Sequence, residues 1–143
     1  MDCTLRCPAV DLHAEVLHLL ARYCHTVDGG LWDEFAELWS ADATFSAVGN
    51  TRQGPADIVG FLEVAQAPGQ RGKHVTINTA VSVEGVSDTV SAVSDFLFVA
   101  AGEGPQDWRI TQVGRYLDAF VRGTDGMLRF AAREVQLGLP SGN

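Results

Sequence analysis

The sequence is poor in positive charge and has no long apolar run. Its 143 residues carry 10 Lys and Arg against 18 Asp and Glu, a formal net charge of -8. A chain of this charge repels a phosphate backbone, so nucleic acid is not an expected partner. No apolar stretch approaches the ~20 residues that cross a bilayer, and the first residues lack the apolar segment of a signal peptide. We therefore expect a cytoplasmic protein without a membrane partner.

Cysteine is also scarce. The three residues, Cys3, Cys7 and Cys24, are odd in number and form no C-x-x-C pair. This pattern argues against a disulfide framework and against a zinc site. We expect Cys3 and Cys7 in a loose N-terminus and Cys24 in the core of a helix. A metal site is the weaker alternative because histidines lie nearby, at His13, His18 and His25. The leading prediction is a protein without metal or cofactor.

Helical periodicity dominates the first half of the chain. Apolar residues recur at helical spacing from Leu12 to Val27, Pro8 suits a first turn, and a pair of glycines follows. Gly54 and Pro55 are typical of the start of another helix. The predicted segments are a helix over 8–27, a second over 31–39, a short strand over 43–48 and a third helix from 54 to a loop at 67–72.

The second half is rich in Val, Thr, Phe and Ile, with glycine-bearing turns between the apolar runs. Four long strands joined in this way predict an antiparallel meander. They span residues 73–84, 89–101, 108–122 and 127–137.

Helices followed by strands indicate an α+β fold, in which the helices cover one face of a sheet. Strands of this length must twist and coil, so the sheet should be strongly curved. We predict N-terminal helices packed in the concave face of a curved antiparallel sheet, a cone-shaped α+β barrel. Helices at the mouth of that sheet would leave one pocket for a small, largely apolar molecule. Residues 9–138 form this single domain, with flexible ends at 1–8 and 139–143.

Several short motifs follow one another in an order that resembles a known family. They are Tyr-Cys-His-Thr-Val-Asp-Gly-Gly over 23–30, Leu-Trp-Ser-Ala-Asp-Ala-Thr-Phe over 38–45, Gly54, Lys-His-Val-Thr-Ile-Asn over 73–78, Gly-Arg-Tyr-Leu-Asp over 114–118 and Arg-Phe-Ala-Ala-Arg-Glu-Val over 129–135. Together they resemble the NTF2-like superfamily, and within it the SnoaL-like group of polyketide cyclases, dehydratases and isomerases, including scytalone dehydratase. The resemblance runs from about residue 10 to 135 and implies a pocket, whereas activity varies among the members.

The resemblance also singles out two residues. Several lyases of the superfamily pair an Asp at the end of the first helix with a His early in the sheet, and Asp28 and His74 stand at those positions. The epoxide hydrolases of the superfamily carry an Arg-x-Asp motif. Asp95 lacks the preceding arginine, so that activity ranks third.

The chemistry of Asp28 and His74 agrees with such a pairing. In helical steps of three and four, Asp28 continues a mainly apolar face through Cys24 and Leu20, so it should point inward. His74 would then act as general base or acid, while Asp28 binds its far nitrogen and stabilises the imidazolium. The alternative is that Asp28 caps a loop and His74 is a core histidine with its hydrogen bonds satisfied.

Other residues are candidates for the same pocket. Tyr23 is a third catalytic candidate, with a role as a core aromatic as its alternative. The candidates for substrate binding are Trp32, Phe45, Phe61, Asn78, Arg115, Tyr116 and Asp118. Each of these could instead be structural, since aromatic packing and ion pairs routinely brace a sheet.

Alternation along the strand after His74 bears on assembly. It places Thr76, Asn78, Ala80 and Ser82 on the face of the histidine, and Val75, Ile77, Val81 and Val83 on the other. If His74 points into the pocket, the apolar set lies on the outer face, which in this superfamily is commonly a subunit interface. We expect a homodimer or larger homo-oligomer; a β-bulge that switches the faces is the alternative.

Together these features predict a cofactor-independent lyase or isomerase. The substrate would be a polyketide-like or other ring-bearing metabolite of natural product biosynthesis, and the reaction a dehydration or cyclisation. A noncatalytic ligand-binding or assembly subunit is the second hypothesis.

Overall fold

A computed structural model describes residues 8–66, 71–84 and 89–138 of the chain. The predicted flexible ends, apart from Pro8, lie outside these ranges, as do Cys3 and Cys7 and most of the predicted loop at 67–72. Within the described ranges, no helix combines the length and the apolar character needed to cross a membrane.

Three helices form where the periodicity predicts them. They are α1 (Pro8–Gly29), α2 (Trp32–Ala36) and α3 (Pro55–Ala65). The second helix is shorter than predicted, because the chain joins the sheet at Leu38, whose carbonyl oxygen accepts a hydrogen bond from Phe130 N–H at 2.9 Å. Trp39, which the prediction placed in the helix, therefore begins a strand.

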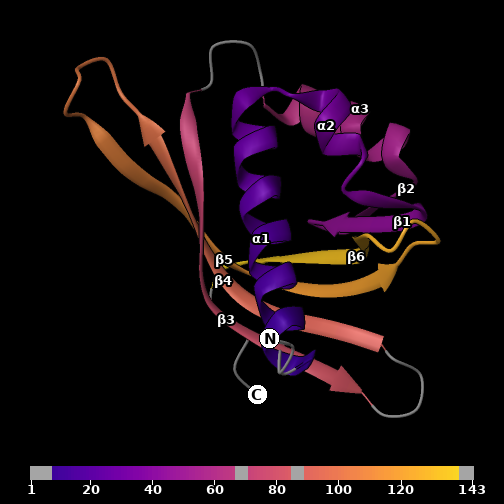
Figure 1. Cartoon of the computed structure of the whole chain (residues 1–143). Coiled ribbons are helices and arrows are strands. Elements are labelled where there is room, and N and C mark those ends of the chain that lie inside the picture. Colours follow the sequence, from indigo (N-terminus) through magenta and orange to yellow (C-terminus); the bar gives the residue numbers. More distant parts are fainter. Residues whose placement is uncertain (1–7, 67–70, 85–88, 139–143) are drawn as a thin grey trace, which may run out of the picture.

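The strands form one six-stranded sheet in the order β2-β1-β6-β5-β4-β3 (Figure 1). Their bounds are β1 (Trp39–Ala47), β2 (Asn50–Gln53), β3 (Gly72–Glu84), β4 (Thr89–Ala101), β5 (Trp108–Arg122) and β6 (Leu128–Leu137). The predicted antiparallel meander of β3 to β6 is confirmed. β1 extends this meander by pairing parallel to β6, its last strand.

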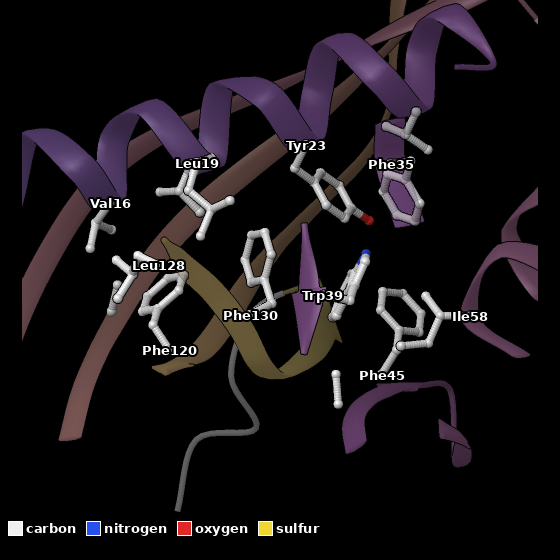
Figure 2. Packing of buried hydrophobic residues seen from close by; sticks show 14 of the residues in the cluster. Val16, Leu19, Tyr23, Phe35, Trp39, Phe45, Ile58, Phe120, Leu128 and Phe130 are labelled. Atoms are coloured by element: carbon white, nitrogen blue, oxygen red, sulfur yellow. The ribbon is translucent and has the colours of Figure 1, made fainter. Parts of the chain in front are cut away.

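The sheet curves around α1, which lies along its concave side (Figure 1). The predicted α+β class and the curved sheet are confirmed, and the barrel is an open one with β2 and β3 at its edges. Figure 2 shows the core between α1 and the sheet. Rings at its centre pack closely, for example Trp39 on Phe130 with centroids 4.9 Å apart. Burial of such rings is the main favourable term in the folding of this layer.

A β-bulge interrupts β3 at Asn78. This residue has a φ of 53°, and the pairing with β4 shifts between Ile77 and Ala80. Before the bulge His74 faces inward, and after it Thr79 does so, hydrogen-bonded to the buried Ser94. The predicted alternation through Asn78, Ala80 and Ser82 is therefore wrong. The bulge, which was the alternative, switches the faces because one extra residue reverses the alternation.

Candidate active site

A cavity of ≈ 240 Å³ lies between the end of α1, α3, β1 and the concave side of β3 to β6. Its walls are mainly aromatic and aliphatic, with a few polar groups, which is typical of a small-molecule site. The lining residues are Tyr23, Phe45, Ala47, Val48, Phe61, Leu62, Ala65, Gln66, His74, Phe96, Phe98, Gln112, Tyr116, Val135 and Leu137.

Asp28 and His74 meet at the edge of this cavity. Oδ1 of Asp28 lies 2.6 Å from Nδ1 of His74, and Oδ2 accepts a hydrogen bond from the main-chain N–H of His74 at 2.9 Å. Both side chains are mostly buried, with 18% and 13% of their surface exposed. Because Asp28 occupies Nδ1, Nε2 is the ring nitrogen left to exchange a proton with a molecule in the cavity.

The local sequence explains how Asp28 reaches His74. Gly30 has a φ of 66° and ends α1 just beyond Asp28, which leaves the carboxylate in the last helical turn. One turn earlier, the Cys24 thiol lies 3.4 Å from the hydroxyl of Thr76 on β3. Two side-chain contacts therefore join the end of α1 to the start of β3. The prediction that Cys24 lies in the helix core is confirmed, since its thiol is buried.

Two glycines make room for the aromatic walls. A Cβ on Gly72 would overlap the ring of Phe98, and a Cβ on Gly114 would overlap the ring of Phe96. Phe98 can therefore lean toward His74, with ring centroids 4.8 Å apart. Phe96 stacks on Tyr116 at 4.2 Å with an interplanar angle of 8°. Glycine beneath a ring lets a strand carry an aromatic side chain flat against the sheet.

A buried arginine lies between the two tyrosines of the cavity. The guanidinium carbon of Arg133 is 4.1 Å from the ring centroid of Tyr23 and 3.7 Å from that of Tyr116. Asp118 accepts two hydrogen bonds from Arg133, 2.7 Å from Nε and 2.8 Å from Nη2, and both side chains are fully buried. The paired charges satisfy each other, and the rings stabilise the cation further.

This surrounding raises the pKa of both tyrosines. Burial raises the pKa of Tyr23 to about 12, although the charge of Arg133 opposes part of the rise. Burial also raises the pKa of Tyr116 well above its ordinary value. A phenol of ordinary pKa is already a hydrogen-bond donor at neutral pH, and the upward shifts extend this state to higher pH.

Two further donors near Tyr23 are buried. Nη1 of Arg133 and Nε1 of Trp39 have no hydrogen-bond partner in the described part of the chain. Both side chains pack on Tyr23, whose ring centroid lies 6.2 Å from that of Trp39. Buried donors without a protein partner cost stability unless a water or a ligand accepts from them.

The structure brings some of the predicted site residues together. Tyr23, Phe45, Phe61, His74 and Tyr116 line the cavity, and Asp28 holds His74 from behind. The Asp28–His74 pair therefore adjoins aromatic side chains that the sequence analysis assigned to the same pocket.

Four of the predicted substrate-binding residues lie elsewhere, which corrects those predictions. Asn78 and Arg115 both donate to Asp95, at 3.1 Å and 3.0 Å, on the outer face of the sheet, where the bulge directs Asn78. Asp118 is fully buried in its ion pair with Arg133 and does not line the cavity. Trp32 packs on Phe35 of the same helix instead of lining the cavity.

Sequence reasoning did not select several residues that shape the cavity or its surroundings. Phe96 and Phe98 alternate on the strand beside His74, a signal that was available once β4 was predicted to pair with β3. Arg133 lies within a motif that carries the family resemblance, but its pairing with Asp118 depends on the register of β5 and β6. Two others are the glutamines Gln66 and Gln112.

A second, larger hollow of ≈ 450 Å³ lies between α1, α2 and the β5–β6 turn. Its charged side chains pair with one another, as in Arg22 with Glu34 and Arg129 with Asp125. Among the described residues, no group of three or more His, Cys, Asp or Glu side chains could hold a metal ion there or elsewhere. We place the candidate active site in the smaller cavity because His74, held by Asp28, lines it.

Comparison with known proteins agrees with this architecture. A family model described as a SnoaL-like domain matches residues 8–134. The chain belongs to the SnoaL-like family. No curated protein matches the sequence of this SnoaL-like chain.

Solved structures show the same fold. ActVI-ORFA from Streptomyces coelicolor is 23% identical, with 89% of this chain and 97% of that chain covered and a TM-score of 0.82. Aln2 from another Streptomyces strain is 25% identical over 94% of both chains, with a TM-score of 0.82. An NTF2-like protein with a cystatin-like fold from Novosphingobium aromaticivorans is 26% identical, covering 99% of this chain and 92% of that one, with a TM-score of 0.78. The resemblance to the NTF2-like superfamily is therefore confirmed.

Proposed function

We propose that this SnoaL-like protein is a cofactor-independent acid–base enzyme, a lyase or isomerase that dehydrates or cyclises a polyketide-like or other ring-bearing molecule. The observation that carries the proposal is the Asp28–His74 pair at the edge of an aromatic cavity. SnoaL-like proteins are often cyclases or dehydratases, which supports the same reaction class.

The pair suits removal of a proton next to a carbonyl group. Nε2 of His74 takes the proton from carbon, the electron pair of the C–H bond forms a carbon–carbon double bond, and the π electrons of the carbonyl group move to its oxygen, giving an enolate. Asp28 stabilises the imidazolium through Nδ1. The proton then passes to a departing hydroxyl, which leaves as water, or returns to another carbon, which completes an isomerisation.

The reaction also requires stabilisation of the enolate oxygen, and the donors near Tyr23 suit that role. The Tyr23 hydroxyl is protonated at neutral pH, and burial, which raises its pKa to about 12, keeps it a donor at higher pH as well. The Arg133 guanidinium, 4.1 Å from the ring centroid of Tyr23, is paired with Asp118 and keeps one buried donor, Nη1, without a partner in the described part of the chain. Preorganised donors and charges in a water-poor cavity are the most effective stabilisers of an oxyanion.

The epoxide hydrolase alternative has less support. Asp95, the carboxylate considered for it, lies on the outer face with Arg115 and Asn78. It does not line the cavity. A noncatalytic binding subunit would keep the aromatic walls but would not use the His74 nitrogen.

Deuterium exchange separates catalysis from binding without the natural substrate. The probe is α-tetralone, a compact bicyclic ketone with protons beside its carbonyl, followed by proton NMR in deuterium oxide. We expect the native protein to exchange these protons faster than buffer and His74→Gln to lose about 10²–10⁴-fold of that rate. His25→Gln is the matched control, because His25 is exposed on α1. Bound ketone without exchange above the buffer rate contradicts the proposal and favours the binding subunit.

A further inference from the structure

The turn between β1 and β2 has an unusual backbone. It consists of Val48 and Gly49, whose φ angles are 51° and 77°. Two positive φ angles in a two-residue hairpin are the pattern of a type I′ turn, whose first position favours Asn, Asp or Gly. A valine there is an outlier, because its branched Cβ crowds the backbone in the left-handed region. Val48 therefore holds a strained conformation.

The side chain of Val48 gains little from the rest of the fold. It is 74% exposed, so packing within the protein does not offset the strain. The hairpin itself maintains the conformation. The Ser46 and Thr51 hydroxyls lie 2.9 Å apart across the two strands. The Asn50 amide donates to the Val48 carbonyl oxygen at 3.3 Å. Neither backbone preference nor burial explains a valine at this position, and strain that the surrounding structure maintains clusters at ligand sites.

Val48 lies at the rim of the candidate active-site cavity, since it lines the cavity and is nevertheless exposed. Phe45 and Ala47 precede it on β1 and line the same wall. Ala47 pairs with Val135 on β6, and Leu137 follows there as a second exposed apolar residue that lines the cavity. Figure 1 shows the β1–β2 hairpin beside α3, whose last turn also lines the cavity. The strained turn therefore presents an apolar side chain where a ligand would enter.

We propose that Val48 is a ligand-binding residue, whose side chain packs on the bound molecule at the rim of the cavity. A ligand that reaches the rim removes the exposed methyl groups from water, a favourable term that the free protein lacks. Valine has a single stiff side-chain torsion, so little conformational freedom is lost on binding. The strained turn thus costs stability in the free protein, whereas the gain appears only in the complex. The inference rests on the proposed function because it requires a ligand in this cavity, but it does not depend on the reaction.

Val48→Asn tests this role because it should move stability and affinity in opposite directions. Asparagine tolerates the left-handed region, so the variant should unfold about 2–6 °C higher than the native protein. It lacks the methyl groups, so it should bind 9-fluorenone about 3- to 10-fold more weakly. This flat three-ring ketone has no proton on the carbons next to its carbonyl group, so it binds without turnover. Calorimetry measures the affinity, and circular dichroism measures the unfolding midpoint.

Two further variants are the controls. Val48→Ile keeps the branched Cβ and the apolar surface, so both the affinity and the midpoint should stay close to the native values. Val64→Asn is the same exchange at a position that is 80% exposed on α3 and does not line the cavity, and it should change neither quantity. Native affinity in Val48→Asn, or a midpoint that does not rise, would overturn the inference. So would a native protein that does not bind 9-fluorenone.

The role of Val48 and the proposed function can fail separately. Weaker 9-fluorenone binding by Val48→Asn, with no exchange of α-tetralone protons above the buffer rate by the native protein, would refute the reaction and keep Val48 in a binding site. Exchange by the native protein, with native 9-fluorenone affinity in Val48→Asn, would refute the role of Val48 and keep the reaction.

Discussion

Asp28 holds His74 at two points, the ring nitrogen Nδ1 at 2.6 Å and the main-chain N–H at 2.9 Å. One carboxylate thereby fixes both the orientation of the ring and the position of the strand that carries it. The second contact distinguishes this arrangement from a surface ion pair, because rotation of the carboxylate would break a hydrogen bond to the backbone as well.

Asp28→Asn tests this relationship. The amide has the shape of the carboxylate but no charge to stabilise the imidazolium, so the exchange rate of α-tetralone protons should fall by about 10²–10⁴-fold. Asp33→Asn, at an exposed position on α2, should leave the rate unchanged. A native rate in Asp28→Asn, with the fold intact by circular dichroism, would show that the pair has only a structural role.

Tyrosine titration tests the cavity environment. The chain has two tyrosines, Tyr23 and Tyr116, so the tyrosinate absorbance reports these alone. Burial raises the pKa of Tyr23 to about 12 and that of Tyr116 well above its ordinary value of 10.0. The native protein should therefore show little tyrosinate at pH 10, where the urea-unfolded chain is half ionised.

The same shifts predict how stability depends on pH. The folded state holds the phenol protons more tightly than the unfolded state, so this contribution to the free energy of unfolding is complete below pH 10.0 and falls as the pH rises toward about 12. Tyr23→Phe should lessen the fall between these values. Urea midpoints that stay constant across this range in the native protein would contradict the burial of both phenols.

Arg133→Met tests the buried ion pair. The change leaves Asp118 as an unpaired, fully buried carboxylate, which typically costs about 3–5 kcal/mol. Arg115→Met removes a comparable partner from Asp95, but both of those side chains are partly exposed, so we expect a change of about 0–1 kcal/mol. Urea denaturation measures both, and equal costs would mean that the burial of Arg133 contributes no special stability.

Gly114→Ala tests the room beneath Phe96. A Cβ there would overlap the Phe96 ring and the carbonyl oxygen of Gln136, so the variant should be destabilised by about 1–3 kcal/mol and bind α-tetralone more weakly. Gly60→Ala on α3 meets open space and should be stabilised by about 0.5–1 kcal/mol. A stable Gly114→Ala variant with native affinity would show that Phe96 can move without consequence.

We also propose that two copies of the chain associate through the outer face of the sheet. Val75, Ile77, Val93 and Val113 are exposed there on three adjacent strands. Light scattering should give a dimer or larger assembly, and Val113→Glu should shift it toward monomer. Val64→Glu, on the exposed side of α3, is the control. A native protein that is strictly monomeric at micromolar concentration would overturn this proposal.

The order of elements could be read from the sequence because each has a local signal. Pro55 opens α3, and the apolar runs of β4 and β5 end where the glycine-bearing turns begin. Asp28 and His74 were also accessible, since the family resemblance pointed to both and helix periodicity indicated that Asp28 faces inward.

What the sequence could not supply depends on register between distant segments. The pairing of Arg133 with Asp118 requires β5 and β6 to align residue by residue. The outward turn of Asn78 requires a left-handed backbone at one position in a long strand. The entry of Trp39 into a strand instead of a helix requires β6, which lies about ninety residues later in the chain.

The bulge at Asn78 divides β3 into two segments with separate tasks. Before the bulge, His74 lines the cavity and Thr76 contacts Cys24 of α1, whereas beyond it Thr79 and Val81 face inward and Val81 packs on the hydrophobic core. Each segment has its own alternation, so a substitution on one side leaves the inward set on the other unchanged. Natural variation could therefore alter the cavity portion of this strand, and with it the ligand, without repacking the core beneath α1.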